Sequence, residues 1–108
     1  MSAPRRIALS LIASLAAGPA AADPAQIELG RRVFTALAEP RCGVCHTLAD
    51  AGTTGEVGPV LDTLKPDAGR VRTAVTNGIG VMPAFEDLTA EQIEAVASYV
   101  AAATGATR

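Results

Sequence analysis

Apolar residues recur at helical spacing in three stretches of the chain, and no stretch alternates convincingly with the two-residue period of a strand. The first stretch begins with Asp23, a candidate N-cap, and Pro24, which suits the first helical position, and it ends at Pro40. Its apolar positions are Ile27, Gly30, Val33, Phe34 and Leu37. A helix is therefore expected between residues 23 and 40.

Two further helices are expected closer to the C-terminus. One covers about residues 67–76, and Asn77-Gly78 after it is a good stop signal. Its apolar face consists of Val71, Ala74 and Val75. The other begins at Thr89, which forms a capping box with Gln92. The buried stripe of this last helix consists of Ile93, Val96, Ala97 and Val100.

The residues between these helices are rich in glycine, threonine and proline, which is typical of loops. One loop is expected over residues 45–66 and another over residues 77–85. No internal repeat interrupts this order. The pattern predicts a small all-α domain.

The first 22 residues have the organisation of a secretory signal peptide. Arg5 and Arg6 provide a positive start, residues 7–17 are apolar, and Ala20-Ala21-Ala22 offers a small-residue cleavage site. The apolar run is shorter than the roughly 18 residues of a membrane-spanning helix, which disfavours an uncleaved anchor. We expect a signal peptide over residues 1–22, cleavage after Ala22, and a mature domain over residues 23–108 in the periplasm.

The mature chain is acidic and poor in large core residues. It carries seven basic and eleven acidic residues, a net charge of −4, and no basic cluster of the kind that binds nucleic acid. Partners selected by charge should therefore present a basic face. Phe34, Phe85 and Tyr99 are its only aromatic residues. Because domains of this size usually need a disulfide or a bound cofactor for stability, an apolar cofactor would complete such a core.

Both cysteines and the only histidine fall within five consecutive positions, as Cys42, Cys45 and His46 in "CGVCH". Thiol–disulfide exchange uses such a cysteine pair in a βαβ context, which the helical pattern does not offer. A structural zinc site needs four ligands, and only three are close in the sequence. Covalent haem attachment uses all three residues: the two thiols bind the haem vinyl groups, and the histidine can coordinate the iron.

With these residues the mature chain resembles the small bacterial class I c-type cytochromes over essentially its whole length. "CGVCH", "GPVL" at residues 58–61 and "VMPAF" at residues 81–85 match successive motifs of that family. The resemblance implies a class I cytochrome c fold wrapped around one haem c, covalently bound through Cys42 and Cys45. It also places Gly30, Phe34 and Tyr99 where the first and last helices pack together.

The iron is expected to have two axial ligands, His46 and Met82. Met1 would leave with the signal peptide, so Met82 is the only methionine of the mature chain. It precedes Pro83 in a loop, where the family places its methionine ligand. The resemblance also implies that the backbone carbonyl of Pro59 orients His46. Val60 follows that proline, where the family usually has asparagine.

Only 36 positions separate His46 from Met82, which is short for the family and suggests a more exposed haem edge. Arg70 and Arg72 are candidate partners of the haem propionates, although solvated helix arginines are the more ordinary interpretation. The residues expected to flank the exposed edge are small or apolar: Gly43, Val44, Ile79, Gly80, Val81, Pro83 and Ala84. Such a surface suits the small contacts of transient redox partners.

Two axial ligands leave no open position on the iron, and no catalytic set of residues is visible, so we expect an electron carrier rather than an enzyme. The chain resembles cytochromes that accompany molybdenum-dependent sulfite dehydrogenases. Electrons would come from a periplasmic dehydrogenase, with a sulfite-oxidising one as the specific candidate, and pass to another cytochrome or an oxidase. The alternatives are a stand-alone shuttle and, from another class, a haem sensor or peroxidase with a labile methionine ligand.

Overall fold

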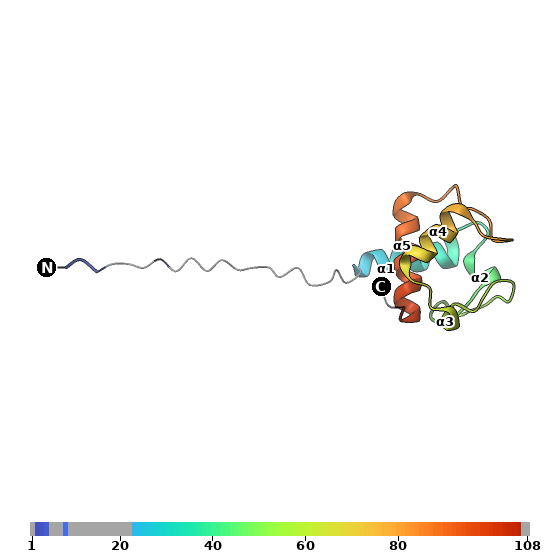
Figure 1. The fold of residues 1–108 in the computed structure, drawn as a ribbon, viewed down its shortest axis with the longest axis horizontal. Coiled ribbons are helices and arrows are strands. Elements are labelled where there is room, and N and C mark those ends of the chain that lie inside the picture. Colours follow the sequence, from blue (N-terminus) through green and yellow to red (C-terminus); the bar gives the residue numbers. More distant parts are fainter. Residues whose placement is uncertain (1, 5–7, 9–22, 107–108) are drawn as a thin grey trace.

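A computed structural model describes residues 2–4, 8 and 23–106, so most of the expected signal peptide and its cleavage site lie outside the described residues. From residue 23 onward the chain is mainly helical (Figure 1). The elements are α1 (Pro24–Arg32), the π-helix η1 (Val33–Leu37), α2 (Cys42–Cys45), β1 (Thr47–Leu48), the 3-10 helix η2 (Ala49–Ala51), β2 (Thr53–Thr54), α3 (Leu61–Leu64), α4 (Ala68–Asn77) and α5 (Ala90–Thr104). No helix among the described residues is long and apolar enough to cross a bilayer.

The three expected helices are present, and their first residues are capped as the sequence indicates. The Asp23 side chain accepts a hydrogen bond from the Ala25 amide at 3.0 Å. Asp67 caps α4 in the same way. At α5, Thr89 and Gln92 form both bonds of the capping box, at 2.9 and 3.1 Å. These contacts satisfy amide groups that a helix N-terminus otherwise leaves without partners.

Two details differ from the expectation. The first helix changes to π-helical hydrogen bonding over Val33–Leu37 and ends before Pro40. The expected loop over residues 45–66 contains a short hairpin, in which β1 pairs antiparallel with β2, and a helical turn, α3. The expectation of no strands was wrong because two-residue strands are too short to show alternation. Gly52 allows the turn between them, since its φ of 68° is left-handed.

The backbones of α1 and α5 come very close where the two helices cross. A side chain built at Gly30 would place its first carbon 2.1 Å from the Ala95 carbonyl oxygen and 2.5 Å from the Tyr99 Cβ. Glycine is therefore required for the two backbones to come this close. One turn later, the Phe34 and Tyr99 rings meet edge to face with their centroids 6.0 Å apart. The packing roles that the resemblance implied for these residues agree with this geometry.

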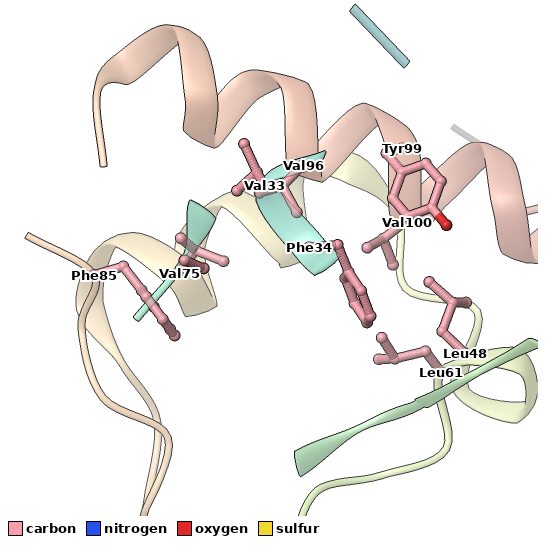
Figure 2. Close-up of a cluster of buried hydrophobic side chains, with 10 residues drawn as sticks. Val33, Phe34, Leu48, Leu61, Val75, Phe85, Val96, Tyr99 and Val100 are labelled. Carbon is pink, nitrogen blue, oxygen red and sulfur yellow. The ribbon is translucent and has the colours of Figure 1, made fainter. Parts of the chain in front are cut away.

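The core extends from this crossing in two directions (Figure 2). Phe34 points from η1 toward Leu48 and Leu61, on the side of the hairpin and α3. Val75 of α4 and Phe85 lie together at the other end of the cluster. Helices, hairpin and loops are thus joined by one continuous apolar cluster.

Tyr99 also makes the polar contact that ties this core to the hairpin. Its hydroxyl donates to Asp50 Oδ2 at 2.6 Å, and Arg31 donates to the same oxygen at 3.0 Å. The Arg31 guanidinium lies over the Tyr99 ring, 5.3 Å from its centroid. Burial, and then the hydrogen bond to Asp50, raise the pKa of Tyr99 well above its ordinary value near 10.

This shift predicts a loss of stability at alkaline pH. Between the ordinary and the raised pKa, the folded protein keeps a phenolic proton that the unfolded chain releases. The free energy of unfolding is therefore unaffected below pH 10 and then falls by about 1.4 kcal/mol per pH unit from this group. Denaturant titrations at several alkaline pH values measure how the free energy of unfolding changes with pH. The Tyr99→Phe variant should lack the part of this decrease that comes from the phenol. A folded-state phenolate titration at the ordinary pKa would contradict the prediction; Tyr99 is the only tyrosine, so its absorbance is unambiguous.

Candidate functional site

The two cysteines lie on α2, a single helical turn. Both are partly buried free thiols. His46 follows directly as the C-cap residue, where the backbone becomes extended, and its amide donates to the Cys42 carbonyl at 3.0 Å. The turn thus brings together the three reactive side chains that the sequence singled out.

The His46 ring has a fixed orientation. Its Nδ1 lies 2.8 Å from the Pro59 carbonyl oxygen. Because a carbonyl oxygen only accepts hydrogen bonds, Nδ1 carries the proton, and in the neutral ring the lone pair is on Nε2. Gly58 permits this arrangement, since a Cβ at this position would lie 2.5 Å from the ring Cε1. The structure therefore contains a histidine oriented to bind a metal through Nε2, with the acceptor that the resemblance implied.

Met82 comes from a separate segment, the loop between α4 and α5. Ile79 and Met82 exchange two backbone hydrogen bonds, at 2.9 and 3.0 Å, which close a tight turn at the tip of this loop. The Met82 side chain is partly buried against the core cluster, as is that of Cys42. In Figure 1 this loop and α2 are at the same end of the domain. The sequence-predicted site residues thus come from two elements that share one end of the core.

The donor set fits a covalently bound haem better than the other two chemistries of paired cysteines. Burial raises the pKa of the Cys42 thiol to about 11. Enzymes of thiol–disulfide exchange need the opposite shift, toward a thiolate. Among the described residues, no three histidine, cysteine, aspartate or glutamate side chains are placed to hold a metal ion, so the zinc hypothesis has no ligand set there. Unpaired thiols beside a histidine with a free Nε2 suit attachment to haem vinyl groups.

Known proteins agree with this chemistry. The family model described as cytochrome c oxidase, cbb3-type, subunit III, matches residues 25–100. The chain is 38% identical over 76 residues to cytochrome c6 of Gloeothece citriformis, a match that covers 66% of each protein. It is 42% identical over 82 residues to cytochrome c6 of Rippkaea orientalis, covering 68% of this chain and 67% of that protein. The chain thus spans about two thirds of the length of both relatives.

A solved structure supports the same assignment. The c-type cytochrome SorU from Sinorhizobium meliloti superimposes with a TM-score of 0.76 and 61% sequence identity, over 78% of this chain and 97% of that one. The chain belongs to the class I c-type cytochromes. Membership implies that this cytochrome binds haem c covalently through its two cysteines, Cys42 and Cys45. Electron transfer is the chemistry common to the family.

The arginines considered for the propionates have other surroundings. Arg72 forms a two-point ion pair with Glu94 of α5, one bond of which is 2.9 Å long. The Arg70 side chain is exposed, and its backbone amide binds Asp67. The interpretation as a solvated helix arginine describes Arg70, whereas Arg72 is paired with a carboxylate of another helix.

Sequence reasoning missed two residues that support the site. Asp50 joins the hairpin to Tyr99 and Arg31, and Thr53 donates a hydrogen bond to the backbone carbonyl of His46. Both belong to the segment expected to be loop. The only sequence signal was a concentration of threonine and aspartate after "CGVCH", which does not reveal the partners of these side chains.

Covalent attachment can be tested directly by changing both cysteines to alanine. The wild-type protein should keep one haem by mass after denaturation and acid–organic extraction, because thioether bonds survive both treatments. The double variant should lose it entirely. Changing Val44, which lies between the cysteines and is 62% exposed, to alanine should leave attachment intact. Haem that remains covalently bound to the double variant contradicts the assignment of Cys42 and Cys45.

Proposed function

We propose that this cytochrome is an exported one-electron carrier. It accepts electrons from a periplasmic dehydrogenase, specifically a sulfite-oxidising one, and passes them to another cytochrome or an oxidase. The observation that carries the proposal is the orientation of His46 by Pro59 on the turn that bears both thiols. The periplasmic location rests on the signal peptide expected over residues 1–22.

In this proposal Cys42 and Cys45 anchor one haem, and His46 Nε2 and Met82 Sδ bind its iron from two different segments. The bound haem supplies an iron that takes up and releases single electrons. The Pro59 carbonyl would hold the imidazole in one orientation through its contact with Nδ1. Methionine is a soft ligand that favours ferrous iron and raises the reduction potential. The chain would fold around the haem, which would complete a core with only three aromatic residues.

Two protein ligands on the iron leave no position for a substrate. The chain also has no second histidine, and no nucleophile beside a base is apparent. These features favour a carrier over an enzyme. A haem sensor or peroxidase would require the Met82 side chain to detach, whereas the paired backbone bonds to Ile79 hold the Met82 backbone in a closed turn.

The residues expected around the haem edge provide an apolar contact surface. Val44 on α2 is 62% exposed, and Ile79 and Val81 in the methionine loop are 70% and 87% exposed. Gly80, Pro83 and Ala84 are also exposed, whereas Gly43 is partly buried. Exposed aliphatic side chains without long flexible stems suit brief docking, because little side-chain entropy is lost on contact.

Charge next to this surface favours a basic partner. A hollow of about 260 Å³ beside the methionine loop is lined in part by Glu39, Glu86 and Asp87. None of the three forms an ion pair with the described residues. Unpaired carboxylates attract a cationic surface during encounter, and salt screens this attraction. The stand-alone shuttle and the dehydrogenase-bound subunit would use the same surface.

The methionine ligand is tested by Met82→Ala. The ferric protein should lose its weak far-red sulfur–iron band, and its reduction potential should fall, because a soft ligand is removed. Val81→Ala, in the same loop, is the matched control and should change neither property. An unchanged band and potential in Met82→Ala would assign the ligand to another residue.

Carbon monoxide separates the carrier from the sensor or peroxidase. The reduced wild-type protein should not bind the gas readily at neutral pH, whereas reduced Met82→Ala should bind it. Rapid binding to the wild-type protein contradicts the carrier hypothesis. Absorption spectra before and after addition of the gas provide the measurement.

The donor is tested by mixing oxidised cytochrome with purified sulfite dehydrogenase and sulfite in a stopped-flow instrument. Haem reduction should be fast at low salt and should slow as salt is added. Replacing Glu86 and Asp87 by their amides should slow it at low salt, whereas Glu28→Gln on α1 should have little effect. No reduction on the timescale of turnover rules out this donor and leaves electron transfer in place.

A further inference from the structure

Three hydrogen bonds hold His46, and only one of the three partner groups belongs to a side chain. Its amide donates to the Cys42 carbonyl at 3.0 Å, and its ring Nδ1 binds the Pro59 carbonyl at 2.8 Å. Its own carbonyl accepts a hydrogen bond from the Thr53 hydroxyl at 2.9 Å. The first two partners are backbone groups, which substitution does not remove. The Thr53 hydroxyl is therefore the one partner of His46 that a substitution can remove.

The Thr53 hydroxyl makes a second bond that strengthens the first. It accepts from the Leu48 amide at 3.1 Å while it donates to His46. Because Leu48 is fully buried in the core cluster, this amide has no access to water and needs a protein acceptor. A hydroxyl that donates and accepts at once has a fixed direction. The two bonds connect the core, through Leu48, to the backbone of His46.

The Thr53 methyl group also contacts the attachment turn. A Cβ at Gly43 would lie 2.3 Å from Thr53 Cγ2, so the hairpin lies directly against α2. Both ends of the Thr53 side chain thus meet the haem-binding motif. The methyl group lies against Gly43, between the two cysteines, and the hydroxyl donates to the His46 carbonyl.

We propose that Thr53 is a positioning residue for the axial histidine, which sets the orientation of the His46 imidazole through the backbone on its C-terminal side. The inference rests on His46 being an axial ligand, as proposed above. Loss of the hydroxyl would remove the donor to the His46 carbonyl and the side-chain acceptor of the buried Leu48 amide. The backbone at residues 46–48 would then relax, and the His46 imidazole would rotate about its hydrogen bond to the Pro59 carbonyl.

The test compares three variants of the haem-loaded protein. Thr53→Val keeps the shape and removes the hydroxyl, whereas Thr53→Ser keeps the hydroxyl and removes the methyl. Thr47→Val is the matched control, because Thr47 donates to the Gly55 carbonyl at 3.0 Å in the same hairpin without bonding to His46. His46 is the only histidine, so its ring protons can be followed by NMR of the ferric protein. Thermal unfolding reports the purely structural effect of each change.

Thr53→Val should shift the hyperfine-shifted His46 ring resonances and the reduction potential, and Thr53→Ser should restore both to wild-type values. Thr47→Val should lower the unfolding temperature and leave the ring resonances in place. Unshifted resonances in Thr53→Val, or equal shifts in Thr47→Val, overturn the positioning role. His46 resonances without any hyperfine shift in the wild-type protein would instead remove His46 as a ligand, and the inference with it.

If Thr53→Val yields no haem-loaded protein, amide exchange in the wild-type protein provides the test. The Leu48 amide should exchange slowly, as the buried donor to Thr53. A Leu48 amide that exchanges as fast as an unbonded surface amide overturns the proposal.

Discussion

The close approach of α1 and α5 at Gly30 is the constraint on which the rest of the structure depends. No other residue type fits there, since even a methyl group would overlap the Ala95 carbonyl oxygen. The approach brings Phe34 and Tyr99 into edge contact and aligns the two apolar stripes that form the core. Ala95 and Ala97 of α5 are fully buried, so the small residues of this helix are part of the packed interior. A core poor in aromatic residues can be dense where backbones approach this closely.

A short series of side-chain contacts connects the helix crossing to the haem-binding turn. The Tyr99 hydroxyl and Arg31 both bind Asp50, which fixes the hairpin against the helices. The hairpin in turn fixes the His46 backbone through Thr53. An electron carrier benefits from such a connection, because a ligand set that changes little between oxidation states needs little rearrangement when an electron is transferred. The terminal helices are thus connected to the site through the hairpin.

The sequence predicted the three long helices, because their signals are local. A capping box at Thr89 and the "CGVCH" turn are read from neighbouring residues, and the structure places them as expected. The hairpin and the bonds of Asp50 and Thr53 were missed for the opposite reason. Their partners lie up to 49 positions away, and a two-residue strand leaves no periodic pattern. The acceptor of His46 was implied by family resemblance, since spacing alone cannot select one carbonyl.

Charges are distributed unevenly over the molecule, and this matters more for recognition than the net charge of the chain. Arg31 and Arg72 are each bonded to carboxylates of other elements, so part of the positive charge is neutralised within the fold. The carboxylates beside the methionine loop have no such partner among the described residues. Glu39, Glu86 and Asp87 line one hollow with Ala84 of that loop, and Ile79 and Val81 at its tip are 70% and 87% exposed. In the function proposed above, these carboxylates would attract a basic partner and the exposed aliphatic side chains would give it an apolar contact, both close to the loop that carries Met82.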